Sequence, residues 1–159
     1  MAFGCDAATA YYKSQIAAGN PLPLKGGVVL SVRDEDKKEV VRLAKQLDEM
    51  GYEIWATRGT STALWHAGIE SNALYRITLG SPNALDLIHL GKVKWIVNTR
   101  EDDESAHSDS IKIRSAATAA GVPFTTTLAG FAEAVKGMAA VKRSKLSAPL
   151  SLQEWHAPR

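Results

Sequence analysis

Short hydroxyl and amide side chains stand where three apolar runs of the sequence end, and these groups could bind an anion. Their hydrogen-bond donors can contact phosphate or carboxylate oxygens without adding bulk. The four residues are Ser31, Thr57, Asn98 and Thr99. Because they follow apolar runs, we expect them at the ends of buried strands.

Cationic and flexible residues accompany these hydroxyl groups. After the second run, Arg58 supplies a cation, Gly59 lets a ligand approach the backbone, and Thr60 adds a hydroxyl at a predicted helix start. Lys37 lies early in the preceding helix, and Arg76 follows a third run. Together these groups form a plausible cradle for a phosphate or a carboxylate.

A purely structural reading of the same residues is compatible with the pattern. Thr60 or Ser61 could cap a helix, because a hydroxyl at that position satisfies a free backbone donor. Lys37 and Arg76 could be solvated surface charges. The residue types alone do not decide between the two readings.

An alternation of strand and helix patterns positions these groups. The expected strands are 28–32, 52–56, 73–75, 93–98 and 122–126, and the expected helices run from Asp34 to Met50, up to Ala67, from Asn83 to Leu90, from Asp109 to Ala120 and from Leu128 to Ala140. Strands that alternate with helices favour a parallel sheet with right-handed crossovers. We therefore predict an α/β fold: a doubly wound, Rossmann-like, three-layer α/β/α domain with a five-stranded parallel sheet.

The chain is expected to have three parts. Residues 1–24 form a helix and a proline-containing linker, residues 25–140 form the α/β domain, and residues 141–159 form a tail without a strong period. Within the domain, the polar stretch 100–108 predicts a loop. Asp109 is then expected to cap the helix that starts there.

The composition argues against several classes of protein. A single cysteine, Cys5, forms no internal disulfide and builds no cysteine-ligated zinc site. The net charge is +2 without a concentrated basic surface, and no apolar run could span a membrane. The four histidines lack metal-ligand spacing. We expect a cytoplasmic protein that binds no nucleic acid, membrane or metal.

Four motifs carry a resemblance to a known family. Leu30–Lys37, Ala56–Thr60, Val97–Thr99 and Thr126–Leu128 occur in the order and at the spacing of the methylglyoxal-synthase-like (MGS-like) domain. The sequence is most similar to the carboxyl-terminal allosteric domain of the carbamoyl phosphate synthetase large subunit. The resemblance extends from about Lys25 to Ala140.

The flanks resemble the same subunit. Residues 13–20 are similar to the segment that connects its catalytic half to this domain, and residues 151–156 are similar to its end. The resemblance implies a piece of a larger ATP-binding ligase, a glutamine-hydrolysing carbamoyl phosphate synthase of pyrimidine and arginine biosynthesis. The implied partners are the catalytic half of the large subunit and, through it, the glutaminase small subunit.

The resemblance also implies a ligand and its site. The family's allosteric domain binds UMP or IMP at the carboxyl ends of its strands, without a cofactor and without catalytic residues. The corresponding residues are Ser31, Lys37, Thr57, Arg58, Gly59, Thr60, Arg76, Asn98 and Thr99. Phe124 and Thr126 correspond to an ornithine site. Because Phe124 replaces a tyrosine and lacks its hydroxyl, the sequence argues against ornithine activation.

Methylglyoxal synthase itself, a phosphate-eliminating lyase of the same fold, is the enzymatic alternative. That reaction needs a carboxylate to remove a proton next to a carbonyl group. The family places this base after a glycine-containing loop, where this chain has Ser81. Asp109 matches another family aspartate, but one carboxylate is insufficient. The inosinate cyclohydrolase domain is a further alternative, against which Arg58 counts because that family has glycine there.

Overall fold

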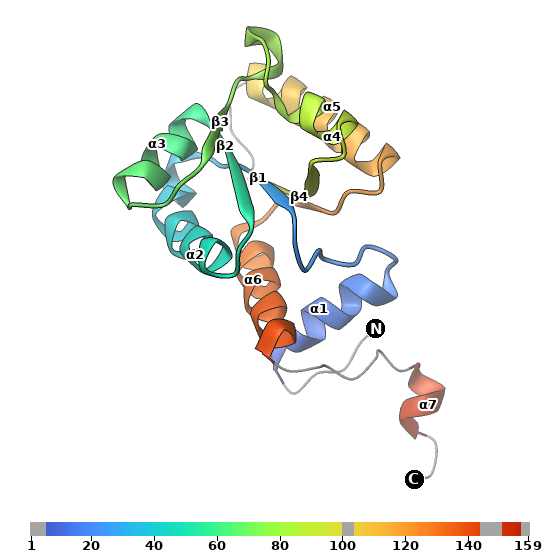
Figure 1. The fold of residues 1–159 in the computed structure, drawn as a ribbon. Helices are drawn as coiled ribbons and strands as arrows, with labels where there is room; N and C mark the ends of the chain where they lie inside the picture. The colour runs from blue at the N-terminus through green and yellow to red at the C-terminus, as the bar shows by residue number, and fades with distance from the viewer. Residues whose placement is uncertain (1–5, 100–103, 144–150, 157–159) are drawn as a thin grey trace.

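A sheet of five parallel strands runs through the computed structural model, which describes residues 6–99, 104–143 and 151–156. The strand order is β3-β2-β1-β4-β5 (Figure 1). The strands are β1 Gly27–Ser31, β2 Glu53–Thr57, β3 Asn72–Leu74, β4 Val93–Asn98 and β5 Phe124–Thr125. The expected doubly wound α/β fold is confirmed.

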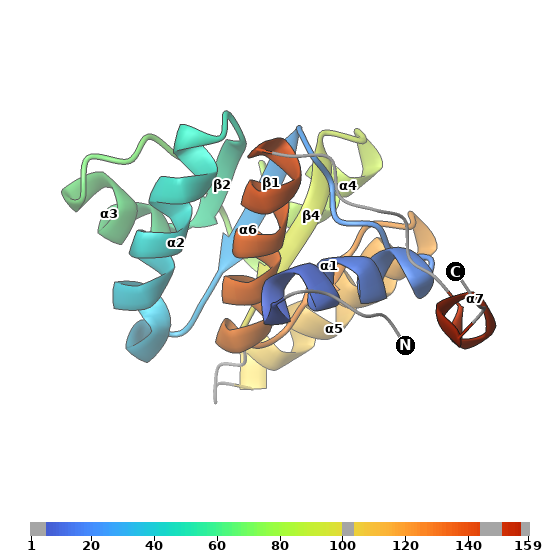
Figure 2. The same cartoon turned by 90° about the horizontal axis from the view of Figure 1, so that it is seen from below.

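Helices cover both faces of the sheet. They are α1 Ala7–Ala17, α2 Lys37–Glu49, α3 Arg58–His66, α4 Ala84–His89, α5 Glu104–Ala119, α6 Leu128–Arg143 and α7 Leu152–His156, with short 3₁₀ turns η1 Asp34–Asp36 and η2 Ile77–Leu79. Helices α2, α3 and α6 share one core cluster with the sheet, and α4 and α5 share the other. Figures 1 and 2 show these two layers, with α1 outside α6.

Burial on both faces explains why the central strands read as continuous apolar runs. Side chains alternate between the two faces along a strand. On β4, Trp95 packs towards α6, where its ring centroid lies 5.4 Å from that of Phe131, while Ile96 belongs to the cluster under α4 and α5. All three side chains are fully buried.

Local sequence signals set the helix boundaries. In α2 the apolar positions from Val40 to Leu47 lie on one buried face, and Gly51 follows with φ +81°. That backbone conformation suits glycine because it has no Cβ. Helix α4 begins with a capping box. The Asn83 side chain accepts the backbone N–H of Asp86, and the Asp86 carboxylate accepts the backbone N–H of Asn83.

Several boundaries differ by one residue from the sequence-based expectation, and three differ by more. Helix α5 begins at Glu104, so part of the expected loop 100–108 is helical and Asp109 lies inside the helix rather than capping it. The sequence pattern predicts a loop here because the first turn of the helix is polar and shows no apolar period. Strand β5 has two residues instead of five, and α6 continues past Ala140 to Arg143. The expected tail also contains the short helix α7. Cys5 lies outside the described residues.

Helix α1, from the expected connecting segment, packs closely against α6. A Cβ placed on Gly137 of α6 would lie 2.8 Å from the carbonyl oxygen of Ala8 and 2.9 Å from Cβ of Tyr12. Tyr12 and Leu22 both belong to the core cluster that contains Trp95. Residues before position 25 therefore contribute to the core of this fold, and the division at residues 24 and 140 stays a prediction.

Two general properties hold for the part of the chain that the structure describes. None of its helices combines the length and the apolar character that a bilayer crossing requires. Nor do its His, Cys, Asp and Glu side chains form a group of three or more that could hold a metal ion.

Candidate functional site

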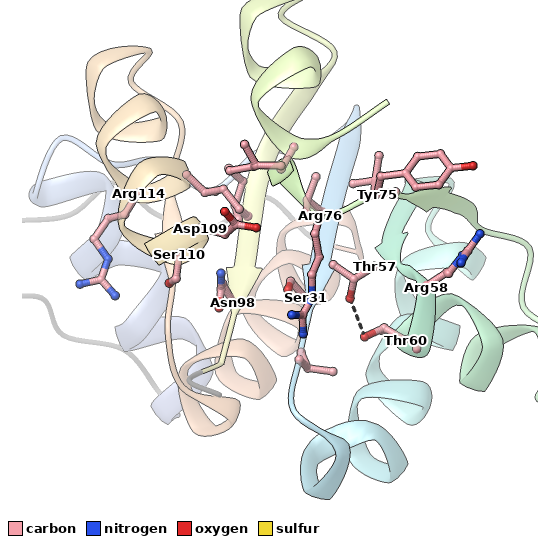
Figure 3. A pocket seen from close by; sticks show the side chains of 18 of the residues that line it. Ser31, Thr57, Arg58, Thr60, Tyr75, Arg76, Asn98, Asp109, Ser110 and Arg114 are labelled. Atoms are coloured by element: carbon pink, nitrogen blue, oxygen red, sulfur yellow. Dashed lines mark hydrogen bonds between the residues drawn. The ribbon is translucent and has the colours of Figure 1, made fainter. Parts of the chain in front are cut away.

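A cavity of about 750 Å³ opens at the carboxyl ends of the strands (Figure 3). This is where loops and helix N-termini converge in a doubly wound sheet. Most of the sequence-predicted nucleotide-site residues line it: Ser31, Lys37, Thr57, Arg58, Gly59, Thr60, Arg76 and Asn98. The fold thus brings together side chains from β1, α2, β2, α3, β4 and the loop after β3.

One end of the cavity is a cradle of hydroxyls and cations at the start of α3. The hydroxyl oxygens of Thr57 and Thr60 lie 3.2 Å apart, and Thr60 is buried. The Lys37 ammonium lies 2.8 Å from the position that a Cβ on residue 59 would take. Because Gly59 has no Cβ, the ammonium can approach the start of α3 this closely. Lys37 also pairs with the exposed Asp34 carboxylate at 2.5 Å. A phosphate here would contact a cation, hydroxyls and the free N–H groups of a nine-residue helix.

The two arginines near this cradle point in different directions. Figure 3 shows the Arg76 side chain extending towards Ser31, between that residue and Thr57. Arg58 turns outwards, and its guanidinium lies over the Tyr75 ring, 5.5 Å from the centroid. Arg76 is therefore the cation placed beside the strand ends, and Arg58 lies at the rim.

The opposite side of the cavity carries a carboxylate that the sequence-based site omitted. Asp109 of α5 is 7% exposed, and its Oδ1 atom has no hydrogen-bond partner among the residues that the structure describes. It faces the strand ends above Asn98, which is also buried (Figure 3). Because a buried polar atom without a partner is costly, this oxygen is available to a ligand donor. The expectation that Asp109 starts its helix concealed this position.

Thr99 is the predicted nucleotide-site residue that does not line the cavity. Its backbone N–H donates to the carbonyl oxygen of Ser31 at 3.1 Å. Its hydroxyl oxygen accepts the N–H of Arg33 at 3.2 Å. Thr99 therefore fixes the loop after β1, next to the cavity.

The two expected ornithine-site residues differ in their relation to the cavity. Thr126 lines the cavity, and Phe124 does not. The Phe124 ring instead lies under the guanidinium of Arg114, which is 5.3 Å from its centroid. Arg114 lines the cavity from α5 and was not anticipated from the sequence. Its position depends on packing between α5 and β5, which no local pattern reveals.

The remaining wall is apolar. Its buried aliphatic side chains are Val29, Leu74, Ala84, Ile96 and Ile113. Its half-exposed or exposed aliphatic side chains are Ile77, Leu79 and Ile111. Leu79 is 71% and Ile111 57% exposed, which is high for large aliphatic residues. Such a wall suits a flat aromatic ring.

Ser81, which the sequence resemblance assigns to the position of the lyase base, takes part in the turn before α4. Its hydroxyl donates to Asp86 at 2.7 Å, and the same Asp86 oxygen accepts the Asn83 N–H at 3.0 Å. The Ser81 hydrogen bond and then the Asn83 N–H lower the pKa of the Asp86 carboxyl. Asp86 is thus held as a helix-capping carboxylate, outside the cavity lining.

Comparison with known families decides which family this fold represents. The family model described as MGS-like domain matches residues 39–126, more than half of the chain. The chain belongs to the MGS-like domain family. This confirms the resemblance found in the sequence motifs.

Curated relatives of this MGS-like domain include carbamoyl phosphate synthases. The chain is 42% identical over 133 residues to the "Carbamoyl phosphate synthase large chain, C-terminal section" of Methanopyrus kandleri, which covers 84% of the chain and 24% of the relative. It is 42% identical over 157 residues to the "Carbamoyl phosphate synthase large chain" of Archaeoglobus fulgidus, covering 98% of the chain and 14% of the relative. The chain thus spans about a quarter or less of these proteins.

A solved structure shares the fold. The crystal structure of methylglyoxal synthase from Elizabethkingia anophelis superposes with a TM-score of 0.59 and 14% identity, covering 87% of this chain and 95% of that chain. At this identity the likeness shows a common fold and carries no statement about activity.

Proposed function

We propose that this MGS-like domain binds a nucleoside monophosphate, UMP or IMP, as a regulatory ligand of a carbamoyl phosphate synthase. Two relatives that are 42% identical to this chain are a large chain of that enzyme and the C-terminal section of one. One observation carries the ligand assignment. A single cavity has a cationic hydroxyl cradle at one end, a buried unpartnered carboxylate opposite, and an apolar wall.

Each part of a nucleoside monophosphate fits one part of this cavity. The phosphate would sit among Lys37, Thr57, Thr60 and Arg76, where charge-assisted hydrogen bonds are strongest. Asp109 would repel a phosphate but accepts hydrogen bonds from sugar hydroxyls, which places the ribose beside it. The base would then lie against the aliphatic wall.

The domain's action is regulatory binding without chemistry. A nucleotide that prefers one arrangement of this domain against the catalytic half of the large chain shifts the equilibrium of the whole synthase. Its effect reaches the glutaminase small subunit through that half. The domain needs no cofactor for this role, and the enzyme works in the cytoplasm.

The test is calorimetric titration of the domain with UMP, IMP, inorganic phosphate and ornithine in parallel. UMP or IMP should bind and raise the melting temperature, because a ligand that binds only the folded state stabilises it. Ornithine at equal concentration should do little. Phosphate binding as tight as that of both nucleotides would contradict the assignment of ribose and base, and absence of nucleotide binding would refute the function.

A further inference from the structure

The lysine of the phosphate cradle is paired with a carboxylate of the chain itself. The Lys37 ammonium contacts the carboxylate of Asp34, which belongs to the 3₁₀ turn η1 between β1 and α2. Both residues line the cavity. Because the ammonium also lies against Gly59, this ion pair stands at the start of α3. An anion that enters the cradle therefore meets Asp34 as well as Lys37.

Other groups hold the η1 turn in place, so the Asp34 side chain can move without it. The Asp36 carboxylate, whose side chain is 9% exposed, accepts the Nε–H of Arg33 at 3.0 Å. The backbone N–H of Arg33 donates to the hydroxyl oxygen of Thr99 at 3.2 Å. The Asp34 side chain, in contrast, is 93% exposed. Its carboxylate can therefore turn into solvent while the backbone of the turn keeps its position.

The ion pair of Asp34 and Lys37 is weak enough for a ligand to break and close enough to oppose one. An exposed ion pair contributes little, because water screens its charges. A phosphate that takes the Lys37 ammonium must replace the Asp34 carboxylate, and it then lies near a like charge. Asp34 therefore lowers the affinity of the cradle for a phosphate without closing the cradle.

We propose that Asp34 is an internal competitor of the ligand: its carboxylate holds the Lys37 ammonium until a phosphate replaces it. This inference deepens the proposed function and rests on it for the position of the phosphate only. The competition weakens the binding of free inorganic phosphate and of a phosphorylated ligand alike, but only the larger ligand has further contacts that compensate. At a given concentration, free phosphate then occupies the cradle less often and competes less with that ligand.

Calorimetric titration of Asp34→Asn with UMP, inorganic phosphate and uridine tests the competition. UMP and phosphate should each bind about threefold to tenfold more tightly than to the wild type, because no carboxylate has to leave Lys37. Uridine, which has no phosphate, should bind equally to both proteins. Glu35→Gln is the matched control, because Glu35 is exposed on the same turn, pairs with Arg33 and does not line the cavity. Its affinities for UMP and phosphate should stay within about twofold of the wild type.

A double-mutant cycle shows whether the effect of Asp34 runs through Lys37. In the background of Lys37→Met, Asp34→Asn should raise the affinity for UMP by less than about twofold, because the carboxylate then holds no ammonium. A gain as large as in the wild-type background would mean that Asp34 only repels the ligand, and the competition would be refuted. Equal or weaker UMP binding by the single variant Asp34→Asn would also refute it, and weaker binding would make Asp34 a residue that positions Lys37.

The outcomes separate this inference from the proposed function. If UMP or IMP binds the wild type but Asp34→Asn binds neither more tightly, the competition is refuted and the proposed function stands. If phosphate binds Asp34→Asn more tightly while UMP and IMP bind neither protein, the competition stands and the proposed function falls. If neither protein binds phosphate or a nucleotide, both are refuted. Asp34 is exposed, so Asp34→Asn should fold, and an unchanged melting temperature without ligand confirms this.

Discussion

Thr57 and Lys37 decide, at the scale of single residues, whether the phosphate cradle works as proposed. A hydrogen bond to a charged group contributes about 1.5–3 kcal/mol, so Thr57→Ala should weaken UMP binding about 10- to 100-fold. Lys37→Ala should do the same, with a larger effect at low salt because its contribution is mainly Coulombic. Calorimetric titration at two salt concentrations measures both.

Lys45→Ala is the control for this prediction. Lys45 carries the same charge further along α2, is exposed, and does not line the cavity. Its removal should leave UMP binding nearly unchanged. If Lys45→Ala weakens binding as much as Lys37→Ala, net charge explains the affinity. Normal UMP binding by Thr57→Ala would show that the phosphate does not sit at the end of β2.

Asp109 tests the ribose position. If its free oxygen accepts a sugar hydroxyl, the domain should bind UMP about tenfold more tightly than 2′-deoxyuridine monophosphate or its 3′-deoxy isomer. Asp109→Asn should reduce this difference to about threefold or less, because the charge-assisted bond is lost. Asp48→Asn, an exposed aspartate of α2, serves as the control. Equal discrimination by wild type and Asp109→Asn would place the ribose elsewhere.

At the scale of elements, the packing of α1 on α6 depends on Gly137. Alanine is the better helix former by about 1 kcal/mol, so Gly137→Ala would stabilise an isolated α6. Here the added Cβ would lie 2.8 Å from the carbonyl oxygen of Ala8, a backbone atom that cannot turn aside. We expect a net loss of about 1–3 kcal/mol in the free energy of unfolding, measured by urea denaturation.

Lys136→Ala is the matched control, because Lys136 neighbours Gly137 and is exposed. Its only described ion pair is with Glu133 on the surface, so the change should stay within about 0.5 kcal/mol. A stabilised Gly137→Ala protein would mean that α1 does not pack on α6 in solution.

The same elements show what the sequence could and could not predict. Buried strands such as β1 and β4 were predictable because burial on both faces leaves an uninterrupted apolar run. The start of α5 was not, because a polar first turn has no period to detect. The sequence therefore predicts a capping role for Asp109, whereas this residue lies within the helix and lines the cavity. The positions of the Arg58 and Arg114 guanidinium groups depend on contacts with aromatic rings of other elements. The sequence of a single segment does not reveal such contacts.

At the scale of the whole molecule, the strand order brings the site together. Strand β1 lies between β2 and β4, so the crossovers on its two sides run in opposite directions along the sheet. A crevice opens at such a point, at the carboxyl ends of the strands. The cradle at the end of β2 and the carboxylate above β4 face each other across it. Sequence pattern predicted the strands and the type of site, but strand order follows from long-range pairing.

The domain shares its fold with a methylglyoxal synthase, so that enzyme's activity can be tested on it. Conversion of dihydroxyacetone phosphate to methylglyoxal requires a carboxylate that removes a proton beside the carbonyl. The sequence resemblance assigns Ser81 to the position of that base, and Asp86 is engaged in the α4 capping box. Among described carboxylates, those of Asp34 and Asp109 line the cavity, and Asp34 pairs with Lys37. We expect no methylglyoxal above background when the domain is incubated with this substrate.

Asp109→Ala makes the assay decisive. If the wild-type domain produces methylglyoxal and Asp109→Ala does not, Asp109 acts as the base and the domain is a lyase of the neighbour's type. Turnover that survives Asp109→Ala would mean that another carboxylate reaches the substrate and that the correspondence of Ser81 with the family's base is wrong. Absence of product, with UMP binding intact in the same preparation, would show that this fold retains the phosphate cradle without the proton-abstracting group.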